Sequence, residues 1–255
     1  MSAFPQFDLK NKVALITGAS KGIGKAMAEA LAAAGASVVV SSRKQEAVDE
    51  VALGIRNAGG EAAAFAANAG SLEELQRLAA FTIEAYGGVD ILINNAAANP
   101  VFGPVLKTDT EAFDKIMDVN VKGPFELAKY CYGSMKERGG GSVINISSVG
   151  GITPEHYLGI YSVSKAALIS LTKVMAKEWG AAGIRANVIC PGLIKTKFSE
   201  ALWSNEQLVN QMVKTLPIAR VGEVEDISGL ALFLASPASA YCTGGVYTAD
   251  GGYTI

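Results

Sequence analysis

The feature of this sequence that most constrains its fold is a regular alternation between short apolar runs and longer segments with helical spacing. The runs read VALIT, SVVVS, VDILIN, SVINIS and RANVIC, starting at Val13, Ser37, Val89, Ser142 and Arg185. Short, β-branched runs of this kind are typical of strands buried on both faces of a sheet. We predict a strand for each, and another for the Ala-rich segment 61–69, although its composition also suits a helix.

The segments between these runs place apolar residues every three or four positions, as one face of a helix requires. Met27, Leu31 and Ala34 follow this spacing, and so does the segment 168–175. Strand and helix in alternation favour right-handed βαβ units. We therefore predict an α/β fold, a Rossmann fold with a doubly wound parallel sheet and helices on both faces. No linker or repeat divides the chain, so residues 1–255 are expected to form a single domain that carries both the cofactor and substrate sites.

Composition excludes several functional classes. The 255 residues carry a formal net charge of −2, which is no basic footprint for nucleic acid or anionic lipid. No apolar stretch approaches the roughly 20 residues that span a bilayer, and Cys131, Cys190 and Cys242 lack the spacing of a disulfide framework or zinc site. Residues 1–8 show no basic segment followed by an apolar one. We expect a soluble, cytoplasmic protein with no metal, membrane or nucleic-acid partner.

A glycine-rich segment, TGASKGIG at 17–24, follows a predicted strand and precedes a predicted helix. In that context Gly18 permits a tight turn, Gly22 lets the backbone approach a pyrophosphate, and Gly24 allows close packing of helix and strand. A phosphate would lie at the helix N-terminus. The spacing is GxxxGxG and not GxGxxG, so an ordinary turn is the alternative. The residues expected to contact a dinucleotide here are Gly18, Ser20, Lys21, Gly22, Ile23 and Gly24.

The end of the second predicted strand indicates which dinucleotide binds. An NAD enzyme places Asp or Glu there to hold the ribose 2′-hydroxyl, but this sequence reads Ser41, Ser42, Arg43 and Lys44. Hydroxyls and a guanidinium can bind a 2′-phosphate, and Lys21 adds another cation. We expect Ser42 and Arg43 to bind the cofactor, with NADP(H) preferred over NAD(H). The alternative is that these are solvated charges at a strand end.

Tyr161 and Lys165 lie four residues apart in YSVSK, at the start of a segment with helical periodicity. Both side chains should therefore project from one helix face. An ordinary Tyr has a pKa near ~10, and a nearby ammonium is expected to lower it. Tyr161 could then donate a proton to a carbonyl oxygen, or remove one from an alcohol, while Ser148 hydrogen-bonds the same oxygen. A surface Tyr–Lys pair and a serine that caps a turn are the alternatives.

Together these residues resemble the short-chain dehydrogenase/reductase family, through essentially the whole chain. The matching segments occur in the family's order and approximate spacing: TGASKGIG at Thr17, NNAA at Asn94, DVNVKG around Asn120, NISS ending at Ser148, YSVSK at Tyr161 and PGLIKT at Pro191. Finer stretches, VVVSSRKQ, NAAANPVFGP and PGLIKTKFS, are similar to the NADPH-dependent carbonyl/retinal reductase branch.

This resemblance implies roles for individual residues. Asn120 would hold a water for proton relay, Ser148 would bind the substrate oxygen, Tyr161 would be the acid/base, and Lys165 would grip the nicotinamide ribose. Ile194 and Thr196 would contact the carboxamide. The other implied cofactor-binding residues are Asn68, Asn95, Ala96, Ala97, Pro191 and Gly192, with Tyr161 and Lys165 also counted among them.

Two positions depart from the family's pattern. Asn68 stands where many members have an Asp that touches adenine, and its amide can still hydrogen-bond the base edge. Ala97 replaces the usual Gly of NNAG, which tightens the backbone there. Neither change removes a reacting group.

Two further features carry functional interpretations. His156, the one histidine in the sequence, invites a catalytic interpretation, but we expect a loop or pocket-rim residue because Tyr161 already supplies the proton chemistry. Phe198, Leu202 and Trp203 follow the cofactor segment and suit either an apolar lid over substrate or ordinary helix packing.

These observations predict an NADP(H)-dependent oxidoreductase that reduces a ketone or aldehyde to an alcohol, reversibly, in a largely apolar pocket. The alternatives are a 3-oxoacyl-[acyl-carrier-protein] reductase docking its carrier through Lys195 and Lys197, an NAD-dependent alcohol or sugar dehydrogenase, and a dinucleotide-sensing scaffold without turnover. The resemblance also implies a homotetramer, with helices near 111–138 and 155–179 pairing across subunits and the tail near 241–255 joining an interface.

Overall fold

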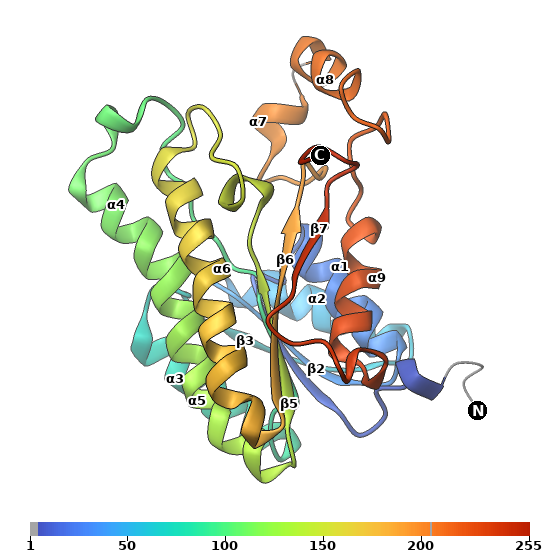
Figure 1. Ribbon diagram of the computed structural model, residues 1–255. Coiled ribbons are helices and arrows are strands. Elements are labelled where there is room, and N and C mark those ends of the chain that lie inside the picture. The colour runs from blue at the N-terminus through green and yellow to red at the C-terminus, as the bar shows by residue number, and fades with distance from the viewer. Residues whose placement is uncertain (1–4, 205) are drawn as a thin grey trace.

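The computed structural model describes residues 5–204 and 206–255. The expectation of a cytoplasmic protein drew on residues 1–8, of which Met1 to Phe4 lie outside the described residues. A seven-stranded, wholly parallel sheet runs through the molecule in the order β3-β2-β1-β4-β5-β6-β7 (Figure 1). The strands are β1 Val13–Thr17, β2 Ser37–Ser42, β3 Glu61–Ala66, β4 Ile91–Asn94, β5 Gly141–Ile146, β6 Ile184–Pro191 and β7 Val246–Ala249.

Helices connect the strands. The α-helices are α1 Gly22–Ala33, α2 Gln45–Asn57, α3 Leu72–Tyr86, α4 Thr110–Met117, α5 Gly123–Glu137, α6 Gly159–Trp179, α7 Glu200–Trp203, α8 Glu206–Val213 and α9 Glu225–Ala235. A π-helical turn, η3 Asp118–Lys122, joins α4 to α5. Short 3₁₀ turns are η1 Pro5–Phe7, η2 Val105–Lys107, η4 Val149–Gly151, η5 Gly180–Ala182 and η6 Pro237–Ser239.

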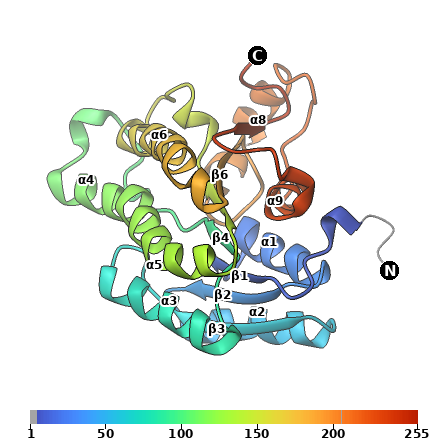
Figure 2. The ribbon, with the colours of Figure 1, turned by 60° about the horizontal axis from the view of Figure 1, so that its bottom comes forward.

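Both faces of the sheet are covered, as the apolar runs predicted. Successive side chains of a strand point to opposite faces, so Ala14 and Ile16 of β1 pack with α1, α2 and α9. Leu15 points the other way, into the cluster formed with α3, α5 and α6. Figure 2 shows the two helical layers on either side of the strands. The predicted doubly wound Rossmann fold is confirmed.

The boundaries differ from the predictions in three places. The Ala-rich segment is a strand, β3, but it ends at Ala66. The helix expected from about Glu155 begins only at Gly159, because Tyr157 has a left-handed backbone with φ of 64° that no helix accommodates. Sequence patterning missed β7, since this edge strand alternates exposed and half-buried residues and so lacks a continuous apolar run.

The strand order places a functional crevice. From β1 the chain proceeds to β2 and β3 on one side, whereas β4 pairs on the other side of β1 and leads to β5, β6 and β7. The segments that follow β1 and β4 therefore leave the sheet in opposite directions at the carboxyl ends of these strands. Open parallel sheets bind ligands at such a point. The glycine-rich segment and the segment after β4 meet at this point.

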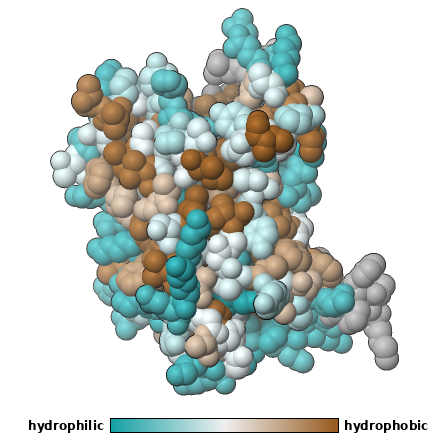
Figure 3. Space-filling view, viewed as in Figure 1, coloured by the Kyte–Doolittle hydropathy of each residue, from teal (hydrophilic) through white to brown (hydrophobic). Residues whose placement is uncertain are grey.

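Apolar side chains also lie at the surface of one helical layer. Figure 3 shows brown, hydrophobic patches over α6 and its neighbours on the face turned to the viewer. The large apolar residues exposed on these helices include Phe113 of α4, Phe125 of α5, and Val163 and Val174 of α6. Within the described ranges, no helix has the length and apolarity needed to cross a membrane.

The opposite, amino-terminal end of the sheet is held by a buried carboxylate. Asp90, which precedes β4, is 4% exposed and accepts hydrogen bonds from Val13 N at 2.8 Å, Arg138 Nη2 at 2.7 Å and Lys12 Nζ at 3.2 Å. The carboxylate thus joins the start of β1, the start of β4 and the end of α5. Removing it would leave the Val13 N–H without its acceptor and the Arg138 guanidinium with backbone carbonyls alone.

We expect Asp90→Ala to lower the free energy of unfolding by about 1–3 kcal/mol, because it leaves the buried Val13 N–H without its acceptor and removes the charged partner of a partly exposed guanidinium. Catalytic parameters at low temperature should stay unchanged, since Asp90 lies at the end of the sheet away from the crevice. Denaturant unfolding measures the first quantity. Glu29→Ala, which breaks the exposed pair with Lys25, is the matched control and should cost less than about 1 kcal/mol; equal losses in the two variants would contradict the assignment.

Candidate active site

The glycine-rich turn has the geometry of an anion cradle. It leaves β1 and enters α1, whose first residue is Gly22 with φ of 59°, a conformation that glycine adopts without strain. A Cβ at Gly22 would lie 3.2 Å from Thr196 Cγ2, so the turn faces the segment after β6. The free N–H groups at the start of α1 point into this space, where they favour a phosphate. The half-buried Ser20 and Ile23 and the exposed Lys21 flank it.

The turn is attached to the segment after β4 by two side chains. Asn95 Nδ2 donates to the carbonyl oxygens of Thr17 at 3.0 Å and Gly18 at 3.1 Å. A Cβ at Gly24 would lie 2.5 Å from this amide and 2.4 Å from Gly18 O, so no larger residue fits there. Gly24 therefore allows the close packing that the sequence predicted.

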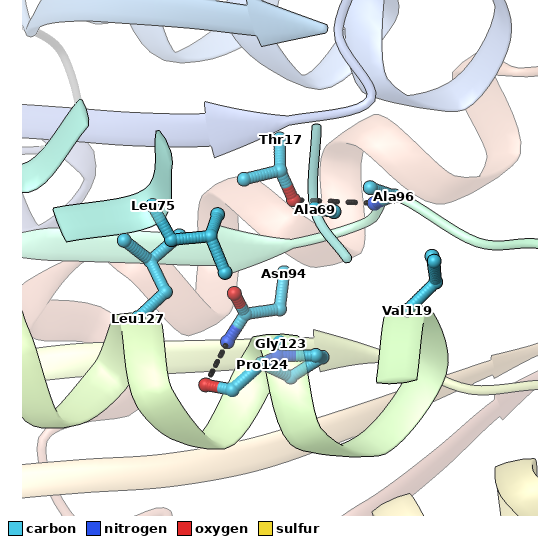
Figure 4. A pocket seen from close by; sticks show the side chains of 9 residues that line it. All are labelled: Thr17, Ala69, Leu75, Asn94, Ala96, Val119, Gly123, Pro124 and Leu127. Carbon is cyan, nitrogen blue, oxygen red and sulfur yellow. Dashed lines mark hydrogen bonds between the residues drawn. The ribbon is translucent and has the colours of Figure 1, made fainter. Parts of the chain in front are cut away.

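Thr17, to which we assigned no role from sequence, completes this attachment. Its hydroxyl accepts from the backbone N–H groups of Asn95 at 3.1 Å and Ala96 at 3.2 Å. Figure 4 shows Thr17 and Ala96 beside a cavity of about 10 Å³, opposite Asn94, which donates to Pro124 O. The hydroxyl thereby orients the backbone that the family pattern assigns to the cofactor.

The end of β2 lies beside the same turn, because Ala19 N donates to Ser41 O at 3.0 Å. Ser42 is half-buried and Arg43 is exposed at this edge. Within residues 5–204 and 206–255, Arg43 and Lys21 form no ion pair with an acidic residue. The neighbourhood of the glycine turn thus presents a hydroxyl and two available cations, and no carboxylate at the strand end.

Asn68 follows β3 in the same row of strand ends. Its Oδ1 accepts from Gly70 N at 3.1 Å and its own N–H donates to Glu74 Oε2 at 2.8 Å. The side chain is exposed, and its amide NH₂ remains able to donate to a base edge. The departure from Asp therefore preserves a polar group at this position.

Tyr161 and Lys165 do share one face of α6, as the spacing predicted. Tyr161 is 8% exposed and its hydroxyl hydrogen-bonds the side chain of Ser148. Lys165 is 2% exposed, with Nζ 5.5 Å from the centre of the Tyr161 ring, and donates to Ile146 O at 2.8 Å. The two side chains and the serine at the end of β5 form one cluster at the carboxyl edge of the sheet.

The electrostatics of this cluster differ from the expectation. Burial raises the pKa of Tyr161 above its ordinary value, and the hydrogen bond from Ser148 opposes this only in part. Burial also lowers the pKa of Lys165 to about 8. The expected lowering of the phenol's pKa by Lys165 is therefore not seen, because desolvation of the buried hydroxyl dominates and the negative charge of Glu155 raises the pKa further.

Asn120 lies in the π-helical turn between α4 and α5 and is fully buried. Its Nδ2 donates to Ala98 O and to Ser164 Oγ, both at 3.0 Å, and its Oδ1 accepts from Ala98 N at 2.8 Å. The amide thus holds the backbone that follows Ala97 against α6. Both N–H groups of the Asn120 amide are thus engaged. A relay water at Asn120 would therefore be held chiefly by the main chain of this residue.

Two serines that the sequence did not single out position the cluster. Ser164 Oγ donates to Tyr161 O at 2.7 Å and accepts from Asn120, so it links the π turn to the helix that carries the tyrosine. Ser147 Oγ donates to Lys165 O at 2.8 Å. Both serines lie inside motifs noted in the sequence, but only the fold shows that their hydroxyls bond to the backbones of the reactive residues.

The segment after β6 closes the other side. Pro191 ends the strand, Gly192 N donates to Ala249 O at 3.0 Å, and Ile194 is buried. Thr196 faces the glycine turn. The segments after β1, β4 and β6, which carry most of the implied cofactor-binding residues, therefore lie next to one another at the carboxyl edge of the sheet.

The proposed lid residues fall into two groups. Trp203 Nε1 donates to Thr196 O at 2.8 Å, so this side chain packs on the cofactor segment. Phe198 is 58% exposed, with its ring centre 6.2 Å from that of Tyr161, so it lies beside the tyrosine. His156 is exposed on the loop before α6, in keeping with a rim residue.

Comparison with known proteins agrees with this architecture. A family model described as enoyl-(acyl carrier protein) reductase matches residues 18–254. Human dehydrogenase/reductase SDR family member 4 is 43% identical over 244 residues, covering 96% of this chain and 88% of the human one.

Two solved structures show the same fold. A 7α-hydroxysteroid dehydrogenase complexed with NADH and 7-oxo glycochenodeoxycholic acid matches with a TM-score of 0.94 and 36% identity, over 99% of this chain and 98% of that one. A gluconate 5-dehydrogenase from Burkholderia cenocepacia in complex with NADP and tartrate has a TM-score of 0.93 and 32% identity, over 98% and 97%.

The chain therefore belongs to the short-chain dehydrogenase/reductase family. It is an NAD(P)-dependent oxidoreductase of that family.

Replacing Thr17 by valine tests the attachment of the crevice. The variant keeps the side-chain shape but leaves the N–H groups of Asn95 and Ala96 without their acceptor, so we expect the free energy of unfolding to fall by about 1–3 kcal/mol and the dinucleotide Kd to rise. Thermal unfolding and fluorescence titration with NADPH measure the two effects. Thr17→Ser retains the hydroxyl and should restore both; a serine variant as impaired as the valine one would show that the methyl group matters instead.

Proposed function

We propose that this protein is an NADP(H)-dependent reductase of ketones or aldehydes, reversible as an alcohol dehydrogenase, with Tyr161 as its acid/base. The observation that carries this proposal is the cluster of Ser148, Tyr161 and Lys165 at the carboxyl end of β5 and the start of α6. It stands beside a crevice whose glycine turn, helix N-terminus and free cations fit a dinucleotide phosphate.

A bound nicotinamide dinucleotide supplies or accepts the hydride. The chain's own residues handle the substrate oxygen and its proton. Because burial raises the pKa of Tyr161, its phenol stays protonated at neutral pH and is ready to donate to a carbonyl oxygen. Ser148, which is hydrogen-bonded to the phenol, can also hydrogen-bond the carbonyl oxygen of the substrate.

Lys165 supports that proton transfer. Its ammonium lies close to the Tyr161 ring, so it stabilises the phenolate that forms when the proton leaves, and a positive nicotinamide in the oxidised cofactor acts in the same direction. The proton lost by Tyr161 can return along a relay near Asn120, whose side chain holds the Ala98 backbone. In this proposal Lys165 also grips the nicotinamide ribose.

The strand end after β2 supports NADP(H) over NAD(H). Relatives of similar fold were solved with NADH or with NADP, so membership of the family leaves the choice open. Here the position of the usual carboxylate is taken by Ser42 and Arg43, and a guanidinium binds a phosphate in a bidentate manner. Lys21, on the facing turn, adds charge of the same sign.

We further propose a single domain that works in the cytoplasm as a homotetramer. The exposed Phe113, Phe125, Val163 and Val174 on α4, α5 and α6 (Figure 3) suit helix pairing between subunits. Light scattering that gave the mass of a monomer would contradict the assembly.

An acyl-carrier substrate has less support. Docking an acidic carrier requires free cations beside the pocket, but Lys195 pairs with Glu223 at 2.8 Å and Lys197 pairs with Glu200. These lysines therefore present a balanced surface and not a basic one. A small, free carbonyl compound is the better fit.

Tyr161→Phe separates catalysis from binding. Loss of the hydroxyl should lower kcat/KM for ketone reduction by about 10²–10⁴-fold, the range of general acid catalysis, while NADPH still binds. The assay follows NADPH absorbance across a ketone panel, and fluorescence titration follows binding. Tyr157→Phe, at a half-exposed tyrosine four residues earlier, is the control and should retain activity. Wild-type turnover in Tyr161→Phe would rule out the proposed acid.

Arg43→Leu tests the choice of cofactor. Removing a charge-assisted contact with the 2′-phosphate should raise the KM for NADPH by about ten- to hundredfold, and the KM for NADH should change little. Steady-state kinetics with both cofactors give the ratio. Lys44→Leu removes a neighbouring charge and should shift the ratio less; equal effects of Arg43→Leu on NADPH and NADH would mean that Arg43 does not read the phosphate.

A further inference from the structure

The loop between η4 and α6 brings a carboxylate to the reactive cluster. A Cβ added to Gly150 would lie 3.5 Å from Ser148 Oγ, 3.2 Å from Ser162 Oγ and 3.8 Å from Glu155 Oε2. The Glu155 carboxylate and the Ser148 hydroxyl therefore both approach Gly150, one from the loop and the other from the end of β5. Glu155 is half-buried there.

The backbone holds Glu155 in this place. Its carbonyl accepts from Leu158 N at 3.2 Å, one turn before α6 begins. Tyr157, two residues further on, contacts Phe102 with ring centres 5.8 Å apart and accepts from Gly103 N at 3.0 Å. The loop that carries Glu155 is thus attached to the segment after β4.

No cation neutralises this carboxylate within residues 5–204 and 206–255. Its partner is the Tyr253 hydroxyl from the C-terminal segment, which hydrogen-bonds the carboxylate. Burial raises the pKa of Glu155, and this hydrogen bond acts against the rise. The negative charge of Glu155 also raises the pKa of the Tyr161 phenol.

A charge that no cation neutralises, in a partly desolvated site, acts strongly on a charged ligand, because the effective dielectric constant there is below that of water. A carboxylate on the substrate, close to its carbonyl, would face Glu155 and be repelled. An ammonium at the same place would be attracted, and a neutral group would be indifferent.

We propose that Glu155 sets the charge specificity of this enzyme, excluding oxo acids whose carboxylate lies near the carbonyl and favouring neutral or cationic carbonyl compounds. The inference rests on the proposed function, since it assumes that Ser148 and Tyr161 receive the substrate carbonyl. Glu155 is here a specificity-determining residue, because it transfers no proton or hydride.

The test uses three acetophenones that differ at one ring position: 3-acetylbenzoate, its neutral methyl ester, and 3-(aminomethyl)acetophenone. For the wild type, we expect kcat/KM for the anion to be about tenfold or more below that for the ester. Glu155→Gln should reduce this anion-to-ester ratio to within about threefold of unity and lower the cation-to-ester ratio. Ratios between substrates cancel any general loss of activity in the variant.

Two variants control for fold and net charge. Glu178→Gln removes the same charge from an exposed position near the end of α6 and should leave both ratios as in the wild type. Glu155→Asp keeps the charge on a shorter side chain, so its anion-to-ester ratio of kcat/KM should stay below unity as in the wild type. Anion-to-ester ratios that are the same in Glu155→Gln and the wild type would overturn the proposal.

Binding distinguishes this inference from the proposed function. Calorimetry with protein saturated in NADP⁺ gives Kd values for the same three compounds without turnover. Charge-dependent binding that Glu155→Gln abolishes, in an enzyme that reduces none of them, would support the specificity role and count against the proposed reaction. Turnover of the ester with charge-independent Kd values, or no binding of any of the three, would refute the role of Glu155.

Discussion

The arrangement of this protein depends on one constraint, the reversal of strand order between β1 and β4. Where the connections after two adjacent parallel strands run in opposite directions, an opening remains above the carboxyl ends of the strands. The backbone N–H and C=O groups at this opening need hydrogen-bond partners. Thr17 and Asn95 provide them, by hydrogen bonds that join the glycine turn to the segment after β4. The crevice is therefore open to a ligand while its two rims are held at a set separation.

A buried ammonium is the second determinant. Lys165 is almost wholly inside the protein and, in the part of the chain described, its Nζ bonds to a backbone carbonyl and to no carboxylate. Burial of such a charge opposes folding, which is why its pKa falls to about 8. Groups that violate the rules of stable cores concentrate at functional sites. The buried position of Lys165 beside Tyr161 therefore supports the proposed role of the pair in proton transfer.

In the proposed function, different parts of the chain serve the cofactor and the substrate. The sheet and the glycine turn would hold the cofactor, whereas loops would cover the substrate: the segment after β4, the loop before α6 and the region around Phe198. Loops tolerate change better than strands, so a change of substrate preference does not require a change in the sheet. Glu155 lies in one of these loops, and its partner Tyr253 lies in the C-terminal segment.

Much of the architecture could be read from the sequence. Apolar runs such as 13–17 and 37–42 indicated buried parallel strands, and the four-residue spacing of Tyr161 and Lys165 placed both on one helix face, because strand and helix periodicities are local properties of the chain. The edge strand β7 and the late start of α6 were missed, since a half-exposed edge has no apolar run and the turn at Tyr157 depends on its neighbours.

Local patterns in the sequence were enough to predict the fold class, the glycine turn and the residues that match the family's motifs. The electrostatics and partners of those residues appear only in the folded molecule. There, desolvation raises the pKa of Tyr161, the Asn120 amide is engaged by Ala98 and Ser164, and both Glu155 and Ser148 approach Gly150. Burial, and contacts between residues distant along the chain, arise only when the elements pack, and no local pattern records them.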